Sequence, residues 1–157
     1  MRSLTKTVSW LLCFTLLSFV TVPVNKALRE KHFNLKDGLA IQGYDPVSYF
    51  TQGKAIKGKK SISLRAYGVL YYFSTEANKN LFKSDYSRYE PEYGGWCAYA
   101  MGNSNEKVEI DPQTFKLIDG KLYLFYNAYF NNTKTSWDKD EKRLKAKADA
   151  NWEKMFR

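Results

Sequence analysis

The sequence is short of the two side chains from which most protein metal sites are built. Its 157 residues include two cysteines, Cys13 and Cys97, and a single histidine, His32. A closed structural zinc site takes about four Cys or His ligands, so this chain alone does not supply one. A nucleophile activated by histidine would have to use His32, which argues against acyl transfer of the Ser-His-Asp or Cys-His type.

The N-terminal segment lacks charge over a long apolar stretch. Residues 8–24 carry no charged side chain, and Arg2 and Lys6 precede them. A basic start followed by an apolar run is typical of a secretory signal peptide. The run is somewhat shorter than the roughly 20 apolar residues that span a bilayer comfortably, which favours a cleaved signal. We therefore expect residues 1–24 to be a signal peptide or, alternatively, an N-terminal membrane anchor, and the protein to be periplasmic or secreted.

Charge and export together narrow the choice of partners. The net charge of +9 at pH 7 would suit either nucleic acid or an anionic surface. In an exported protein this charge favours envelope components over nucleic acid. Once the signal is removed, Cys97 is the sole cysteine, so no disulfide can form within the chain in a compartment where thiols tend to be oxidised.

Length and composition indicate one globular domain. The 157 residues are 44% hydrophobic and 17% aromatic, which is enough to bury a core and argues against disorder. Residues 25–38 are rich in charge and are predicted to form a weakly structured tether in which His32 is solvated. Residues 39–157 are then predicted to form a single domain.

Two β-hairpins are predicted from alternating and β-prone runs of residues. The first joins residues 61–67 to residues 69–73 through a turn that contains glycine. The second joins residues 115–118 to residues 121–126 through Asp119-Gly120, a dipeptide typical of two-residue hairpin turns. Neither hairpin needs a crossover connection, so antiparallel pairing is expected.

Further elements surround these hairpins. A short central helix is predicted after the first hairpin, with Ser74 as its N-cap. Residues 107–110 are predicted to form a short strand that stops at Asp111-Pro112. From about Thr135 a C-terminal amphipathic helix is predicted, since apolar residues recur at helical spacing. Its apolar stripe consists of Trp137, Leu144, Ala148, Trp152 and Met155. The predicted fold class is α+β, with antiparallel β-hairpins packed with a short central helix and a C-terminal amphipathic helix.

The candidate site is a glycine-cysteine stretch, defined here as residues 93–100. Its glycines permit left-handed backbone angles and leave room for a ligand. Its aromatic side chains could supply the walls of a pocket and phenolic groups for hydrogen bonds. The residues expected to bind a small ligand are Tyr93, Gly94, Gly95, Trp96, Cys97 and Tyr99.

The thiol of Cys97 has three interpretations. A single cysteine in an exported protein can be a buried apolar residue, a reactive thiol or a metal ligand. By ligand type, a copper-type or other transition metal ion could be held by Cys97, His32 and a methionine such as Met101. His32 is far from Cys97 and Met101 in the sequence, so the metal site depends on the fold bringing it to them.

Three aspartates stand next to proline or glycine. Asp45 and Asp111 precede prolines, and Asp119 precedes a glycine. Such positions favour turns, so we interpret all three as turn formers and not as the carboxylate pair of an enzyme. Asp111 follows a predicted strand and could also face the site.

Several ordered blocks of the sequence resemble the exported, stand-alone YHS-domain proteins of bacteria, from about Leu39 to Trp152. The blocks are residues 40–50, the strand end at 71–74, the glycine-cysteine stretch, Asp111-Pro112, residues 119–124 and residues 148–152. The resemblance implies a hairpin-helix core and a link to metal handling, with no established activity for the stand-alone members.

The chain departs from the metal-associated relatives where those carry cysteines. Here Asp45-Pro46-Val47 is followed by Ser48, and Phe73 is followed by Ser74, so no thiol stands at either place. The resemblance therefore does not imply metal binding at these positions. Cys97 is the remaining candidate ligand, and it lies outside the hairpin-helix core.

Two functional hypotheses from different classes result. In the first, the protein is an exported, non-enzymatic YHS-like module that binds a metal ion or a small ligand through the Cys97 region. In the second, Cys97 is the reactive group of a thiol-dependent redox protein, and an external thiol resolves it. The first is favoured because neither a resolving cysteine nor a general base stands near Cys97 in sequence. A third alternative is a structural envelope protein with a buried cysteine.

Overall fold

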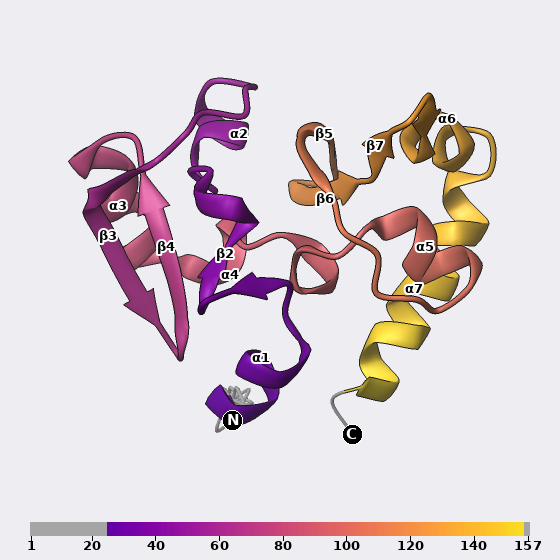
Figure 1. Ribbon diagram of the computed structural model, residues 1–157, viewed down its shortest axis with the longest axis horizontal. Helices are drawn as coiled ribbons and strands as arrows, with labels where there is room; N and C mark the ends of the chain where they lie inside the picture. Colours follow the sequence, from indigo (N-terminus) through magenta and orange to yellow (C-terminus); the bar gives the residue numbers. More distant parts are fainter. Residues whose placement is uncertain (1–24, 156–157) are drawn as a thin grey trace, which may run out of the picture.

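The computed structural model describes residues 25–155 and has a sheet-rich N-terminal half and a more helical C-terminal half (Figure 1). The N-terminal half holds a four-stranded sheet in the order β1-β2-β4-β3. Its strands are β1 (Leu35–Lys36), β2 (Leu39–Ala40), β3 (Lys59–Ala66) and β4 (Val69–Phe73). Its helices are α1 (Lys26–His32), the 3-10 turn η1 (Ile41–Gly43), α2 (Ser48–Thr51), α3 (Glu76–Ser84) and α4 (Tyr86–Tyr89).

The C-terminal half begins with the glycine-cysteine stretch and ends in a long helix. Its helices are the 3-10 turn η2 (Glu92–Gly95), α5 (Ala98–Asn103), α6 (Thr133–Asp138) and α7 (Glu141–Met155). Its strands form the hairpins β5 (Asp111–Ile118) with β6 (Lys121–Phe125), and β7 (Asn127–Ala128) with β8 (Asn131–Asn132). Helices and antiparallel hairpins together confirm the predicted α+β class.

Both predicted hairpins are present. Strands β3 and β4 pair antiparallel, and β4 turns Val69, Tyr71 and Phe73 into the core while its other two residues face outward. Strands β5 and β6 meet at Asp119-Gly120, where both residues have left-handed backbone angles (φ 51° and 73°). That geometry is the one Asp-Gly adopts in two-residue hairpins, so the short-range pattern was sufficient to predict this hairpin. The parallel contact of β2 with β4 was not predicted, because it joins segments 31 residues apart through Leu39 and Leu70.

The central helix α3 is capped one residue later than predicted. The Thr75 side chain accepts a hydrogen bond from the Asn78 backbone amide and forms the N-cap. Ser74 is instead engaged by Asp45, whose carboxylate accepts hydrogen bonds from the Ser74 amide and hydroxyl at 2.8 and 2.6 Å. The same carboxylate accepts from the Val47 amide and from Asn78 Nδ2, and it is completely buried. Asp45 therefore forms its turn and also ties that turn to the end of β4, since a buried carboxylate has to be hydrogen-bonded.

The short strand predicted at residues 107–110 is wrong, because no strand is assigned there and β5 starts at Asp111. Asp111 pairs with Phe125, and the register shifts before Phe115. Pro112 lies within this irregular section, where a strand tolerates the loss of a backbone donor. The Asp111 carboxylate accepts from the Gln113 amide, which forms the local turn that the sequence indicated.

The predicted C-terminal helix is two helices. Trp137 lies on α6, and the rest of the apolar stripe lies on α7 after a break at residues 139–140. Within α7, Leu144 and Ala148 are buried against α5. The two helices approach so closely at Gly102 that a Cβ there would lie 2.3 Å from the Leu144 carbonyl oxygen.

Residues 25–38, expected to be a tether, are instead folded onto the domain. Asn25 caps α1, and the guanidinium of Arg29 is buried and donates two hydrogen bonds to the carboxylate of Glu90. Tyr71 donates a further hydrogen bond of 2.6 Å to that carboxylate. Burial lowers the pKa of Arg29, but the bond to Glu90 and its charge outweigh burial and raise it. The sequence did not show this, because the partner of Arg29 lies 61 positions away.

The segment predicted to be a signal peptide or anchor, residues 1–24, lies outside the described residues. Among residues 25–155, none of the helices has the length and apolar character needed to cross a membrane.

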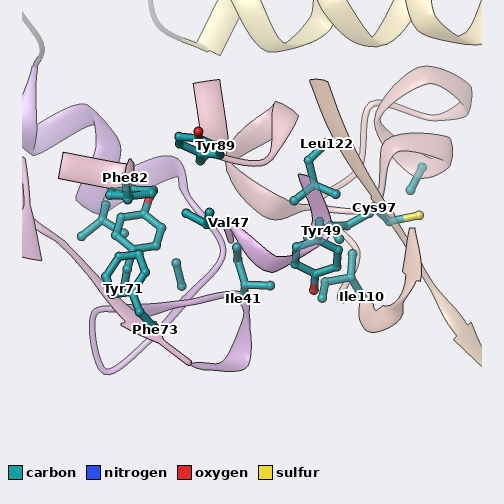
Figure 2. Packing of buried hydrophobic residues seen from close by; sticks show 14 residues of the cluster. Ile41, Val47, Tyr49, Tyr71, Phe73, Phe82, Tyr89, Cys97, Ile110 and Leu122 are labelled. Atoms are coloured by element: carbon teal, nitrogen blue, oxygen red, sulfur yellow. The ribbon is translucent and has the colours of Figure 1, made fainter. Parts of the chain in front are cut away.

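Two hydrophobic clusters make up the core. The first extends from Tyr71, Phe73 and Phe82 at one end to Ile110 and Cys97 at the other (Figure 2). The second lies around α5 and α7 and includes Tyr93, Tyr123 and Trp137. The glycine-cysteine stretch contributes to both clusters, so it lies where the two halves of the molecule join.

Candidate functional site

The glycine-cysteine stretch is a tight left-handed turn followed by a helix. Tyr93, Gly94 and Gly95 have φ angles of 55°, 60° and 86°, and α5 begins directly after Cys97. Glycine adopts such angles freely, whereas tyrosine does not, so the turn needs compensation from its surroundings.

Gly94 lies against two aromatic rings. A Cβ at this position would lie 2.7 Å from Phe33 Cδ1 and 2.8 Å from Trp152 Cη2. The space that the sequence suggested for a ligand is therefore filled by the protein's own side chains. Gly94 is required for packing as well as for its backbone angle.

Tyr93 faces inward and is committed to contacts within the protein. Its ring packs against Tyr123 and Trp152, with centroids 5.8 and 6.5 Å away. Its hydroxyl donates a 2.8 Å hydrogen bond to the Asp149 carboxylate on α7. Burial, followed by this hydrogen bond, raises the pKa of Tyr93 far above its usual value. The phenol is thus a structural donor.

Cys97 is completely buried in the first cluster (Figure 2). Its Sγ lies 3.3 Å from Thr133 Oγ1 and 3.4 Å from the Tyr126 backbone nitrogen. The Thr133 hydroxyl in turn donates to the Tyr126 carbonyl at 2.9 Å. The thiol therefore joins the start of α5 to the end of β6 and the start of α6. Reactive thiols are at least partly exposed, so this geometry favours the structural interpretation of Cys97.

His32, the second predicted metal ligand, is held elsewhere. Its Nδ1 lies 3.2 Å from Lys107 Nζ, and its backbone carbonyl accepts a 2.7 Å hydrogen bond from the Trp96 indole. Desolvation and then the charges of Lys107 and Lys31 lower the pKa of His32. Within residues 25–155, no group of three or more His, Cys, Asp or Glu side chains is arranged to hold a metal ion. Met101 is buried in the second cluster, so the proposed ligand set of Cys97, His32 and Met101 has no geometric support.

The remaining aromatic residues of the stretch lie at its edge. Trp96 is half-buried between the His32 carbonyl and Lys107, whose Nζ lies 5.8 Å from the Trp96 ring centroid. Tyr99 is also half-buried and packs against both clusters. The side chains of Tyr93, Trp96, Cys97 and Tyr99 pack into the protein or lie at its surface, and they are not arranged around a shared ligand site.

Backbone groups of the stretch instead position the walls of a nearby groove. The Asn34 amide donates to the Gly94 carbonyl at 2.9 Å, and Asn34 Nδ2 donates to the Gly95 carbonyl at 3.3 Å. Asn34 Nδ2 is also 3.2 Å from the Glu109 carboxylate, and the Cys97 amide donates to the Val108 carbonyl at 3.0 Å. These bonds fix Asn34 and residues 108–109, and Asn34 and Glu109 form two sides of the groove.

The groove lies on the outward face of the four-stranded sheet and has a volume of about 730 Å³. Its lining is contributed by Asn34, Leu35, Lys36, Asp37, Leu39, Ile41, Gln42, Leu70, Tyr72, Glu109 and Ile110. It contains none of residues 93–100. A pocket of this size suits a small organic molecule.

Local contacts hold the walls and floor of the groove together. Gln42 has a left-handed backbone angle (φ 51°), and its Nε2 donates a 2.9 Å hydrogen bond to the Ile110 carbonyl on the opposite wall. A Cβ on Gly43 would lie 3.3 Å from the Tyr72 ring and 3.4 Å from Leu39. The absence of a side chain at position 43 thus lets Tyr72 and Leu39 pack closely in the groove floor.

Sequence reasoning missed this groove. Its residues come from three separate segments. The sequence predicted these to be the tether with the first residues of the domain, a hairpin strand and a short strand before Asp111. One signal was available: residues 69–73 are large and β-prone at every position, not only at alternate ones. A strand that is apolar on both faces has a second face to cover, and Leu70 and Tyr72 form that face here.

Comparison with known proteins adds no relative. No family model, no curated protein and no solved structure matches the chain.

Proposed function

We propose that this chain is an exported, non-catalytic YHS-like binding module and that it binds a small amphipathic molecule in the sheet groove. The groove, with its apolar floor and charged rim, is the observation that carries this proposal. Export is part of the proposal and is supported by the charge pattern of residues 1–24.

The lining defines the class of ligand. Leu39, Leu70 and Tyr72 offer an apolar and aromatic floor that would contact the hydrocarbon part of a ligand. The charged residues of the lining are one lysine, Lys36, and two acids, Asp37 and Glu109. Two carboxylates against one ammonium give the lining a net charge of −1 in a chain of net charge +9, and we call this part of the groove the acidic rim. A molecule with an aromatic or aliphatic body and one positive group fits this arrangement best.

The metal and redox versions of the function have less support. Both need an accessible thiolate, whereas Cys97 is buried and hydrogen-bonded to Thr133. The glycine-cysteine stretch does not contact the ligand in this proposal. It positions the groove walls, because it holds Asn34 and residues 108–109 in place.

Phenethylamine is a suitable probe, with phenylacetate as the control of opposite charge. In two-dimensional NMR spectra of the full chain, we expect phenethylamine to shift the amide signals of residues 34–42, 70–72 and 109–110. Glu109→Gln keeps the shape of the rim and should weaken phenethylamine binding about fivefold, because one charge-assisted contact is lost. Tyr72→Ala should weaken it about tenfold by removing the ring from the floor.

Tyr67→Ala is the matched control for the loss of a tyrosine. Tyr67 is half-exposed on the same hairpin but does not line the groove, so its removal should leave phenethylamine binding unchanged. Equal binding of phenylacetate and phenethylamine would contradict the acidic rim. Shifts confined to other residues, or absent for both probes, would contradict the groove as the site.

A further inference from the structure

The hairpin of β7 and β8 ends in two aromatic residues that face solvent. Tyr129 and Phe130, which we call the aromatic tip, have relative exposures of 92% and 112%. Among residues 25–155 they are by far the most exposed of the large hydrophobic residues, since the next, Tyr67, is 49% exposed. Strand β7 lies beside α6 at the upper right of Figure 1, on the side of the molecule away from α1.

The backbone conformation at the tip is unfavourable for aromatic residues, so these residues do not stabilise the fold through the turn itself. Tyr129 and Phe130 have φ angles of 50° and 63°, the left-handed conformation of a two-residue hairpin turn. Asn and Gly are the residues preferred at such positions, and bulky aromatic side chains are rare there. Since neither ring is buried, packing within the chain does not offset this strain.

The stretch of sequence that carries the tip is free of charge. From Leu122 to Thr133 the sequence contains no charged residue, and Lys121 and Lys134 stand on either side. Asparagines precede and follow the tip at positions 127 and 131. A tip of this kind can enter a less polar medium without removing a charge from water.

Size distinguishes a lipid surface from a protein partner. Two aromatic side chains bury about 300–500 Å² at most, whereas a stable protein interface buries about 800 Å² on each partner. Insertion into the bilayer interface needs only a small apolar area when anionic lipids attract a basic protein. Without Arg2 and Lys6, the rest of the chain still has a net charge of +7, and this charge supplies that attraction.

We propose that the aromatic tip inserts into the interfacial region of an anionic lipid bilayer. Phenol and phenyl rings suit this depth, since one is amphipathic and the other apolar. The tip gives the basic protein a defined contact with the membrane, independent of residues 1–24 and of the groove.

The test places a fluorescent indole at the tip of the full chain. Phe130→Trp keeps an aromatic side chain at the same backbone angle, and its signal is the difference from the native chain, which has the same residues 1–24. With phosphatidylglycerol vesicles that contain brominated lipid, we expect a blue shift and quenching of the added indole. Phosphatidylcholine vesicles should need about tenfold more lipid for the same effect, because they lack the anionic charge.

Tyr67→Trp is the matched control, because Tyr67 also has a left-handed angle (φ 47°) in a hairpin turn. Its added indole should show neither shift nor quenching. Absence of both effects for Phe130→Trp, or equal effects for the two variants, would overturn the proposal. A blue shift of the Phe130→Trp indole that rises with protein concentration in the absence of vesicles would identify a second copy of the chain as the partner and would also overturn it.

Discussion

The glycine-cysteine stretch and the aromatic tip share a strained backbone but differ in what surrounds it. Tyr93 and Tyr129 have nearly the same left-handed angle, at φ 55° and 50°. The Tyr93 ring is buried against two aromatic rings, and its hydroxyl is bonded to Asp149. The Tyr129 ring is exposed to water.

This difference separates strain that serves the fold from strain that serves a contact outside the chain. In the stretch, burial and hydrogen bonds outweigh the unfavourable angle, so the native state is more stable with tyrosine than with a turn-forming residue. At the tip no internal contact outweighs it, so the aromatic pair is explained by binding and not by stability. Four measurements test this difference between the two regions.

The largest effect is expected from a methyl group at Gly94. Gly94→Ala places a Cβ 2.7 Å from Phe33 and 2.8 Å from Trp152 at a left-handed angle. Overpacking and backbone strain together should lower the free energy of unfolding by about 4 kcal/mol. Denaturant unfolding followed by circular dichroism measures the change.

Gly120→Ala is the control for backbone strain alone. Gly120 has φ 73°, and no other atom lies within 4 Å of the Cβ position. Its replacement should lower the free energy of unfolding by about 1 kcal/mol. Equal losses for the two variants would show that packing around Gly94 is looser than described.

Replacing the left-handed tyrosine with asparagine should change the free energy of unfolding in opposite directions in the two regions. Tyr93→Asn relieves the backbone angle but empties a buried aromatic site, so it should lower the free energy of unfolding by about 3 kcal/mol. Tyr129→Asn with Phe130→Gly creates the preferred turn sequence and should raise it by about 1 kcal/mol. Loss of stability in the tip variant would show that the aromatic pair contributes to the fold, which our comparison does not allow.

Cys97 tests whether the stretch is closed to solvent. In a Cys13→Ser chain, maleimide should label Cys97 only at denaturant concentrations that unfold the protein, because Sγ is completely buried. Cys97→Ala should lower the free energy of unfolding by about 1–2 kcal/mol, since the contacts with Thr133 and Tyr126 are lost. Rapid labelling of the native chain would restore the redox interpretation.

The smallest effect is expected from tyrosine ionisation, which should leave the free energy of unfolding unchanged at neutral pH and lower it above pH 10. Burial, followed by the charge of Glu92, raises the pKa of Tyr123 to about 12. A phenol whose pKa is higher in the folded state contributes stability below its unfolded pKa of about 10, and this contribution is lost as the pH rises toward 12. Absorbance at 295 nm and circular dichroism should therefore report ionisation of the buried tyrosines and unfolding together. Ionisation of all tyrosines before any unfolding would contradict the burial of Tyr93 and Tyr123.

Elements with local causes could be predicted from the sequence. The turn at Asp119-Gly120 and the alternation in β4 depend on neighbouring residues, and both hairpins were predicted. The ion pair of Arg29 with Glu90 depends on residues 61 positions apart, so α1 was predicted to be a tether. The groove was missed for the same reason, because its walls come from three segments.

The prediction for the candidate site was limited by a different cause. Glycines and aromatic residues around a thiol look alike in sequence whether they surround a ligand or each other. At Gly94 the space is filled by Phe33 and Trp152 and not by a ligand, and neither residue is near Gly94 in the sequence.

Composition and short-range pattern were therefore enough to predict the α+β class, the two main hairpins, the basic charge and the lack of ligands for a closed zinc site. The burial of Cys97, the folding of residues 25–38 and the exposure of a groove and an aromatic tip became visible in the folded chain. Those features depend on which distant side chains fill the space around each residue, and solvent exposure is a property of the packed chain alone.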